Sequence, residues 1–159
     1  MGATLSADGA SLYVWYSDEA HTQLFTSTTV TGNMTLYGVK VADVTYGAYE
    51  FVNDGGSLVS DNAGISSSTA SVTVTMLGNY SFTYNYVVSS ESGWDKFSVS
   101  QTVGGNTSAP VSGASGEDEG TKTVAMAAGD SITFKYTKDG SGNRGDDCVT
   151  LTLTITPIA

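Results

Sequence analysis

The sequence predicts an all-β protein whose strands form an antiparallel β-sandwich or jelly roll. In segments 131–137 and 149–155 apolar residues alternate with polar ones, so each segment is expected to bury one face and expose the other. Strand-like segments recur along the chain with turn signals between them, which is typical of sandwiches. The 19 glycines, 2 prolines and abundant Thr, Ser, Val and Tyr residues suit strands and turns. No segment has a sustained helical period.

In chain order, a strand is predicted wherever this alternation or a run of β-branched and aromatic residues occurs. The expected strands are residues 12–16, 34–41, 44–52, 72–76, 80–88, 95–99, 124–126, 131–137 and 149–155. Residues 106–121, rich in Ser, Gly and acidic residues, are expected to form a long loop. Asp95 has the same parity as Phe97 and Val99, so its side chain is expected to point inward at the rim of a sheet.

The charge balance restricts the classes of partner. The 159 residues include 16 acidic and 6 basic ones, a formal net charge of −10. Nucleic acids and anionic membranes are disfavoured, because phosphate contacts need clustered Lys and Arg. An acidic surface suits cation binding and equally suits plain solubility. No run is apolar enough to span a membrane, so membrane insertion is not expected.

Enzyme signatures are weak, and a non-enzyme is predicted. Cys148 is the only cysteine, which excludes an internal disulfide and a thiolate-rich zinc site. It is expected to be a small buried residue, because the only histidine, His21, lies far away in the sequence. The chain has no phosphate-binding loop, dinucleotide fingerprint or nucleophile elbow. A lysine–asparagine isopeptide bond is not expected either, because the final strand offers no asparagine.

An acidic, glycine-rich loop at 138–147 separates the last two strands, and chemistry is most expected there. It is too polar for a core and too long for a tight hairpin turn. If this loop meets the start of the strand at 95–99, five carboxylates converge: Glu91, Asp95, Asp139, Asp146 and Asp147. Oxygen ligands in a flexible loop suit Ca²⁺, which takes 6–8 of them. The alternative is a salt-bridged rim in which Lys138 and Arg144 neutralise the acids.

The N-terminal part resembles half of a known repeat. Trp15-Tyr-Ser-Asp18, Phe25 and Val30-Thr-Gly-Asn-Met-Thr-Leu-Tyr37 are similar to the second half of the Listeria–Bacteroides (internalin B-type) repeat, a small β module of bacterial surface proteins. The resemblance implies a surface-protein context and no particular chemistry. We expect a short β unit at 1–42, followed by a jelly-roll domain at 43–159. Because a half-module cannot close its own core, the unit is expected to pack on the jelly roll.

Residues 70 to 156 resemble a second family. The similar segments are, in order, Ser89-Ser-Glu-Ser-Gly-Trp-Asp-Lys-Phe97, Ser112-Gly113, Ala127-Ala-Gly-Asp130, Phe134-Lys-Tyr-Thr-Lys-Asp-Gly-Ser141 and Gly145-Asp-Asp-Cys-Val149. This set resembles the MAM-like group of bacterial jelly rolls, which includes the cleaved-adhesin domains of secreted proteases. The usual tryptophan after the central serine-glycine is absent, and the last strand reads Cys-Val-Thr-Leu rather than alanine-tryptophan-isoleucine-aspartate. The resemblance implies a jelly-roll sandwich with an adhesive or carbohydrate-binding role.

The predicted function is therefore a non-catalytic carbohydrate-binding or adhesive module of a bacterial cell-surface or secreted protein. It would act outside the cell, on a polysaccharide or glycan, joined to other domains of a larger surface protein. Because sugars stack on exposed aromatic rings, the candidate contact residues are Trp94, Trp15 and Tyr16. Each tryptophan has a structural alternative, Trp15 as a packed core residue and Trp94 as a cap on the sandwich core. The alternative function is a structural spacer or protein-docking domain without a sugar site.

Overall fold

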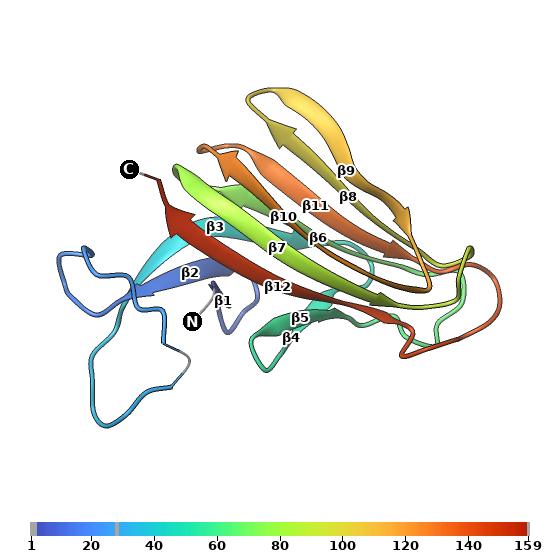
Figure 1. The fold of residues 1–159 in the computed structure, drawn as a ribbon, viewed down its shortest axis with the longest axis horizontal. Helices are drawn as coiled ribbons and strands as arrows, with labels where there is room; N and C mark the ends of the chain where they lie inside the picture. Colours follow the sequence, from blue (N-terminus) through green and yellow to red (C-terminus); the bar gives the residue numbers. More distant parts are fainter. Residues whose placement is uncertain (1–2, 28, 159) are drawn as a thin grey trace.

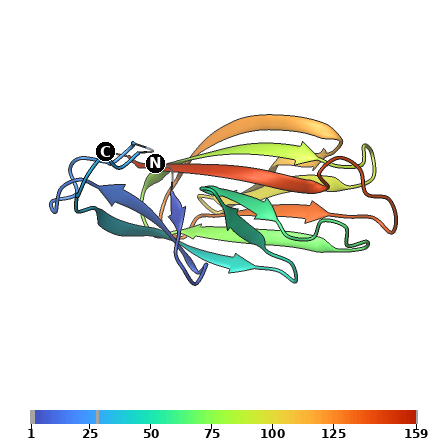
Figure 2. The same cartoon turned by 90° about the horizontal axis from the view of Figure 1, so that it is seen from below.

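The computed structural model describes residues 3–27 and 29–158, and all regular secondary structure in this part is β. The strands are β1 (Thr4–Leu5), β2 (Ser11–Tyr16), β3 (Tyr37–Tyr46), β4 (Phe51–Asp54), β5 (Ser57–Ser60), β6 (Thr69–Met76), β7 (Tyr80–Ser89), β8 (Lys96–Val103), β9 (Asn106–Ala114), β10 (Glu117–Met126), β11 (Ser131–Thr137) and β12 (Cys148–Pro157). They form two antiparallel sheets packed face to face (Figure 1, Figure 2). In this described part no helix is long and apolar enough to cross a membrane.

Strands β5 to β12 have the pairing order of a jelly roll. The first sheet has the order β1-β2-β3-β6-β11-β8-β9, and the second has the order β10-β7-β12-β5-β4. The pairs are nested in the sequence, because β5 pairs with β12, β6 with β11, β7 with β10 and β8 with β9. Successive nested pairs lie in alternate sheets, so a doubled-back chain wraps around one core. The predicted antiparallel jelly-roll sandwich is confirmed.

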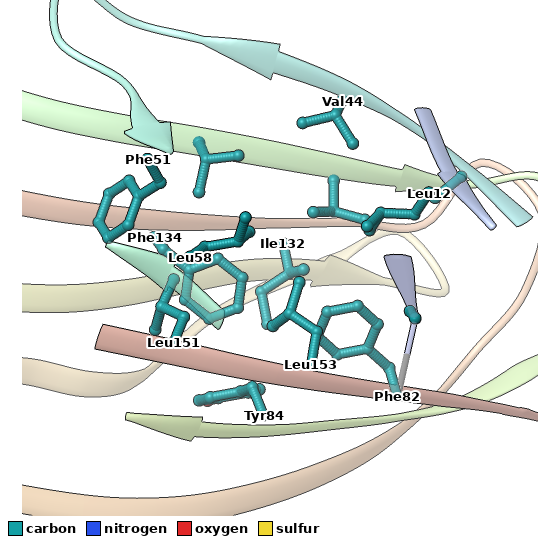
Figure 3. Packing of buried hydrophobic residues seen from close by; sticks show 14 of the residues in the cluster. Leu12, Val44, Phe51, Leu58, Phe82, Tyr84, Ile132, Phe134, Leu151 and Leu153 are labelled. Atoms are coloured by element: carbon teal, nitrogen blue, oxygen red, sulfur yellow. The ribbon is translucent and has the colours of Figure 1, made fainter. Parts of the chain in front are cut away.

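The core lies between the sheets and consists of the inward faces that the alternation predicted. Phe82 and Tyr84 of β7 and Phe134 of β11 are completely buried (Figure 3). The rings of Tyr84 and Phe134 meet edge to face across the two sheets, with centroids 5.1 Å apart. Phe97 of β8 lies nearly parallel to Phe134, with centroids 6.5 Å apart. Large aromatic side chains bury the most surface per residue, so these rings supply much of the hydrophobic stabilisation.

The outer faces of the sheets carry many threonine and serine residues. The hydroxyls of Thr73 and Thr133 lie 2.8 Å apart across β6 and β11, and those of Thr83 and Thr123 lie 2.8 Å apart across β7 and β10. β-Branched side chains favour strands, and cross-strand hydroxyl pairs add to the pairing energy. The strands are thus supported on the face that has no core to pack against.

The prediction of a long loop at 106–121 is wrong. These residues form β9 and the first half of β10. The two strands lie at the edges of different sheets, β9 beside β8 and β10 beside β7. An edge strand has one unpaired side and little buried surface, so it tolerates the polar residues that suggested a loop. Residues 117–119 are exposed even though each pairs with a residue of β7.

The N-terminal unit continues the first sheet. β3 begins at residue 37, not at 34 as expected, and runs to residue 46, so the expected boundary between residues 42 and 43 falls inside one strand. One side of β3 pairs with β2 and the other side pairs with β6. Leu12 and Val41 are buried in the same hydrophobic cluster as the jelly-roll residues. The leading strands therefore pack on the jelly roll and share its core.

Removing residues 1–36 tests this shared core. Loss of β1 and β2 uncovers one edge of β3 and the core around Val41, so the shortened protein is expected to melt at a lower temperature and to bind the dye ANS more strongly. Circular dichroism during heating and ANS fluorescence measure the two effects. An unchanged melting temperature in a monomeric product would show that the N-terminal unit is independent of the jelly roll.

Candidate functional site

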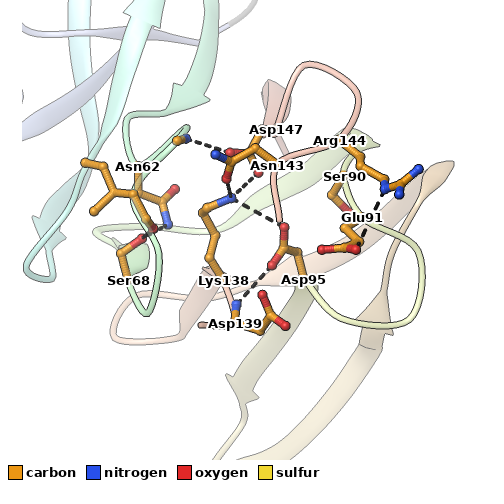
Figure 4. A network of polar contacts seen from close by, with 12 residues as sticks. Asn62, Ser68, Ser90, Glu91, Asp95, Lys138, Asp139, Asn143, Arg144 and Asp147 are labelled. Carbon is orange, nitrogen blue, oxygen red and sulfur yellow. Dashed lines mark hydrogen bonds and ion pairs between the residues drawn. The ribbon is translucent and has the colours of Figure 1, made fainter. Parts of the chain in front are cut away.

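Three loops meet at one end of the sandwich (Figure 4). They are the β5–β6 loop at 61–68, the β7–β8 turn at 90–95 and the β11–β12 loop at 138–147. The first is tied to the third by a backbone hydrogen bond of 2.8 Å, which the N–H of Lys138 donates to the carbonyl of Ser68. The third is tied to the second by the N–H of Asp139, which donates to Oδ1 of Asp95 over 3.0 Å, so the acidic loop and the start of β8 meet, which was the condition for the predicted site.

A lysine occupies the centre of this end. Phe134, Tyr136 and Lys138 share one parity, so the lysine continues the inward face of β11 just beyond the end of the strand. Its side chain is 1% exposed. The ammonium forms an ion pair with Oδ1 of Asp147 and lies 3.4 Å from Oδ2 of Asp95. A buried ammonium needs such counter-charges, because an unpaired charge in the interior is very costly.

Asp147 is held by groups from several elements. Its Oδ1 also accepts a hydrogen bond of 3.1 Å from the Tyr136 hydroxyl, and its Oδ2 accepts one of 2.6 Å from the Gly64 N–H. Burial raises the pKa of the carboxyl, but the ion pair with Lys138 and these hydrogen bonds outweigh it and leave the pKa below its usual value. The ionised carboxylate therefore stabilises the fold at neutral pH, and this contribution is lost as the pH falls through the lowered pKa.

Asp95 approaches the ammonium from the β7–β8 turn. Its side chain is completely buried, which confirms the predicted inward orientation. The N–H of Asp139 donates to Oδ1 of Asp95 over 3.0 Å, and Lys138 also donates to Oδ1 of Asn143 over 3.1 Å. One positive and two negative charges leave the cluster with a formal charge of −1, which the neutral donors of Asp139, Tyr136 and Gly64 help to stabilise.

The other three predicted calcium ligands lie outside the buried cluster. Glu91 pairs at 3.8 Å with the exposed guanidinium of Arg144. Oδ1 of Asp139 accepts a hydrogen bond from the N–H of Ser141, and Asp146 is exposed. Within residues 3–27 and 29–158 no three His, Cys, Asp or Glu side chains are grouped so that they could hold a metal ion.

The charge arrangement matches the salt-bridged alternative. The ammonium of Lys138 lies between Asp95 and Asp147, so these two carboxylates do not fit a Ca²⁺ site in this arrangement (Figure 4). Arg144 neutralises Glu91 in the same way at the surface. Calcium binding at this end of the sandwich stays a prediction.

Trp94 is a surface residue, so its interpretation as a cap on the core is wrong. Its side chain is 65% exposed, although the next residue, Asp95, is completely buried. The turn that carries it is held by a hydrogen bond of 3.0 Å from the N–H of Gly93 to Oγ of Ser115, in the β9–β10 turn. A second, of 3.3 Å, runs from the N–H of Trp94 to the carbonyl of Glu91.

The two aromatic candidates of β2 lie on opposite faces of the first sheet. Trp15 is half-buried on the outer face, outside the core, where its ring stacks on Tyr13 with centroids 6.2 Å apart. Its Nε1 donates to Oγ1 of Thr4 over 2.6 Å. Tyr16 points inward and is only 7% exposed, so its ring face is not available to a surface ligand.

Several residues of the buried cluster were not singled out from the sequence. Tyr136 shares the parity of Lys138, and this alternation is a signal that would have placed the lysine inside. The loop residues Gly64 and Ser68 carry no comparable signal, because only the folded chain brings the β5–β6 loop to Asp147.

No family model matches the chain, and no curated protein matches it. Among solved structures it is similar to the secreted serine protease VesC from Vibrio cholerae, with a TM-score of 0.56 and 16% sequence identity. The match covers 74% of this chain and 25% of that chain, so it spans about a quarter of the protease. At this identity the likeness concerns the fold alone.

Replacing Lys138 with Met tests the buried cluster. Removing one partner of a buried ion pair costs about 3–5 kcal/mol, so Lys138→Met is expected to lower the free energy of unfolding by that amount. Chemical denaturation measures the change. Arg144→Met is the matched control, because an exposed ion pair contributes only about 0–1 kcal/mol. Equal effects of the two substitutions would contradict the buried role of Lys138.

Calcium binding is tested by melting the protein in millimolar Ca²⁺ and in a chelator. An ion that binds only the native state raises the melting temperature. If the predicted ligands hold Ca²⁺, the metal is expected to raise it, and Asp139→Ala should reduce the shift. Superimposable melting curves in the two conditions would end the calcium hypothesis.

Proposed function

We propose that the protein is a non-catalytic carbohydrate-binding or adhesive module of a bacterial surface or secreted protein, with Trp94 as its main contact to a glycan. The observation that carries the proposal is the 65% exposure of this large aromatic side chain on a turn with a fixed backbone. Sugar rings stack on such faces, and a turn whose backbone is already held in place loses little entropy on binding.

Two charged side chains lie on the turn that carries Trp94 and on the β11–β12 loop. The carboxylate of Glu91 and the guanidinium of Arg144 form a pair at the surface, where both can hydrogen-bond to sugar hydroxyls. Arg144 is 77% exposed and therefore free to reorient toward a ligand. A ring on the surface, rather than in a cleft, suits an extended polysaccharide better than a small enclosed sugar.

The charge and the comparisons are compatible with this role. A net charge of −10 disfavours nucleic acids and anionic membranes as partners. The similar structure, VesC, is a secreted protein, which agrees with a place for this chain outside the cell as one domain of a larger protein. The protease activity named for VesC is not carried over, because the match spans a quarter of that protein.

Affinity electrophoresis through gels that contain soluble polysaccharides tests the proposal. The protein is expected to be retarded by at least one glycan, and Trp94→Ala is expected to weaken binding by about tenfold or more, because a stacking contact is lost. Leu77→Ala is the matched control, since Leu77 is 46% exposed at the opposite end of β7. Equal retardation of Trp94→Ala and the unmodified protein, with both folded, would refute the assignment of Trp94.

A structural spacer or protein-docking domain is the second candidate. The observation that favours it is the buried cluster around Lys138, which ties three loops together at one end of the sandwich. A domain that only spaces or docks its neighbours needs such rigidity and no sugar site. Absence of retardation by any glycan, in a protein that melts cooperatively, would support this alternative.

A further inference from the structure

The Lys138 amine and the Asp147 carboxyl are in direct contact and have almost no access to water. Their side chains are 1% and 6% exposed, and the neighbouring Asp95 side chain is completely buried. In water an amine and a carboxylic acid stay ionised and apart. In the folded protein the two groups form an ion pair, so a proton can pass directly from one to the other, and groups held in contact react as if at an effective concentration of roughly 10⁵–10⁸ M.

We propose that Lys138 and Asp147 become joined by a covalent side-chain amide, which forms without any added cofactor and with Asp95 as the proton-transferring group. The bond would be a permanent modification of the folded protein. The sequence offered no asparagine in the last strand, but an aspartate directly before β12 serves as the acyl partner and loses water where an asparagine would lose ammonia.

The atoms balance within the three side chains. A proton passes from the Lys138 ammonium to the Asp147 carboxylate, which leaves a neutral amine beside a carboxylic acid. Nζ of Lys138 attacks Cγ of Asp147 and forms the C–N bond. The Asp95 carboxylate takes a proton from this nitrogen and returns it to the Asp147 hydroxyl, whose C–O bond breaks as water leaves. The products are one amide and one water, and Asp95 is regenerated.

The surroundings of Asp147 suit the acyl partner in this step. The Tyr136 hydroxyl and the Gly64 N–H point at its two oxygens, and such donors stabilise the negative charge that develops on oxygen when a nucleophile attacks. Asp147 also has a φ of 55°, a left-handed conformation that a non-glycine residue adopts only when its surroundings hold it there. The carboxyl group is thus fixed against the amine.

The bond would link the two layers of the sandwich. Lys138 follows β11 of the first sheet, and Asp147 precedes β12 of the second. The formal charge of the cluster is −1 before and after the reaction, because Asp95 stays ionised. After the reaction Asp95 keeps the hydrogen bond from the Asp139 N–H and can accept another from the new amide N–H. The reaction therefore leaves no new unpaired charge in the interior.

Mass spectrometry of the denatured, unmodified protein tests the proposal. The intact mass is expected to be lower than the sequence mass by one water. Trypsin cleaves after Lys135 and Arg144 but not after a Lys138 whose side chain is an amide, so a linked protein yields peptides 136–144 and 145–159 as one species. An undiminished mass and the separate peptides 136–138, 139–144 and 145–159 would overturn the proposal. A link between Lys138 and Asp95 would instead join peptide 136–144 to peptide 41–96. A link to Asn143 would close a ring inside peptide 136–144 with loss of ammonia. Either result overturns the choice of Asp147.

Two variants and one internal control complete the experiment. Lys138→Arg keeps the positive charge but cannot form the amide, so its mass should equal its sequence mass. Asp95→Asn removes the proton acceptor, and the linked peptide is expected to be lost or much reduced. A linked peptide of undiminished yield in Asp95→Asn would refute the role of Asp95. Cyclisation at Asp139-Gly140 would also remove one water, but it would leave residues 136–144 unlinked from peptide 145–159. The peptide map therefore distinguishes this reaction from the proposed amide.

Discussion

The structure at the loop end of the sandwich depends on one constraint, the burial of the Lys138 charge. An ammonium that is 1% exposed has no water to solvate it, so its counter-charges must reach it. Asp95 comes from the β7–β8 turn and Asp147 from the β11–β12 loop, and Gly64 of the β5–β6 loop binds Asp147 in turn. Three segments that are far apart in the sequence are therefore held together by contacts that compensate the charge of one lysine.

The nested topology explains why these segments are neighbours. β12 runs antiparallel to β7, which places Cys148 opposite Ser89, and β11 runs antiparallel to β8, which places Thr137 opposite Lys96. The end of β7 therefore lies beside the beginning of β12, and the beginning of β8 lies beside the end of β11, at the same end of the sandwich. The jelly-roll topology thus brings the polar loops to one end of the sandwich, and hydrogen bonds between the loops then hold them together.

The alternation of apolar and polar residues predicted the strands that have one solvent-exposed face and one buried face. It identified the inward faces of β7, β11 and β12 and the inward orientation of Asp95. It failed for β9 and the first half of β10, since an edge strand buries too little to show a period, and their pairing partners are set by the whole sandwich. The starting point of β3 was also misplaced, because strand ends depend on pairing rather than on composition.

The site was predictable only in part. Two of the five predicted carboxylates, Asp95 and Asp147, belong to the buried cluster, and the meeting of the acidic loop with the start of β8 entered the prediction only as a condition. Whether a metal or a lysine neutralises the carboxylates depends on where one ammonium lies, and only the parity of Lys138 with Tyr136 bears on that. The solvent exposure of Trp94 depends on the path of a turn, which no periodic pattern encodes.

Adjacent residues of the β7–β8 turn have opposite surroundings, and this contrast connects stability with binding. Asp95 is completely buried against Lys138, while Trp94 is 65% exposed. A side chain anchored in the interior restrains the backbone of its neighbour, so the ionic cluster helps to fix the turn that carries the indole. Less backbone entropy is then lost when a ligand binds to this turn. The buried charge that fixes the fold would in this way also prepare the surface proposed to contact a glycan.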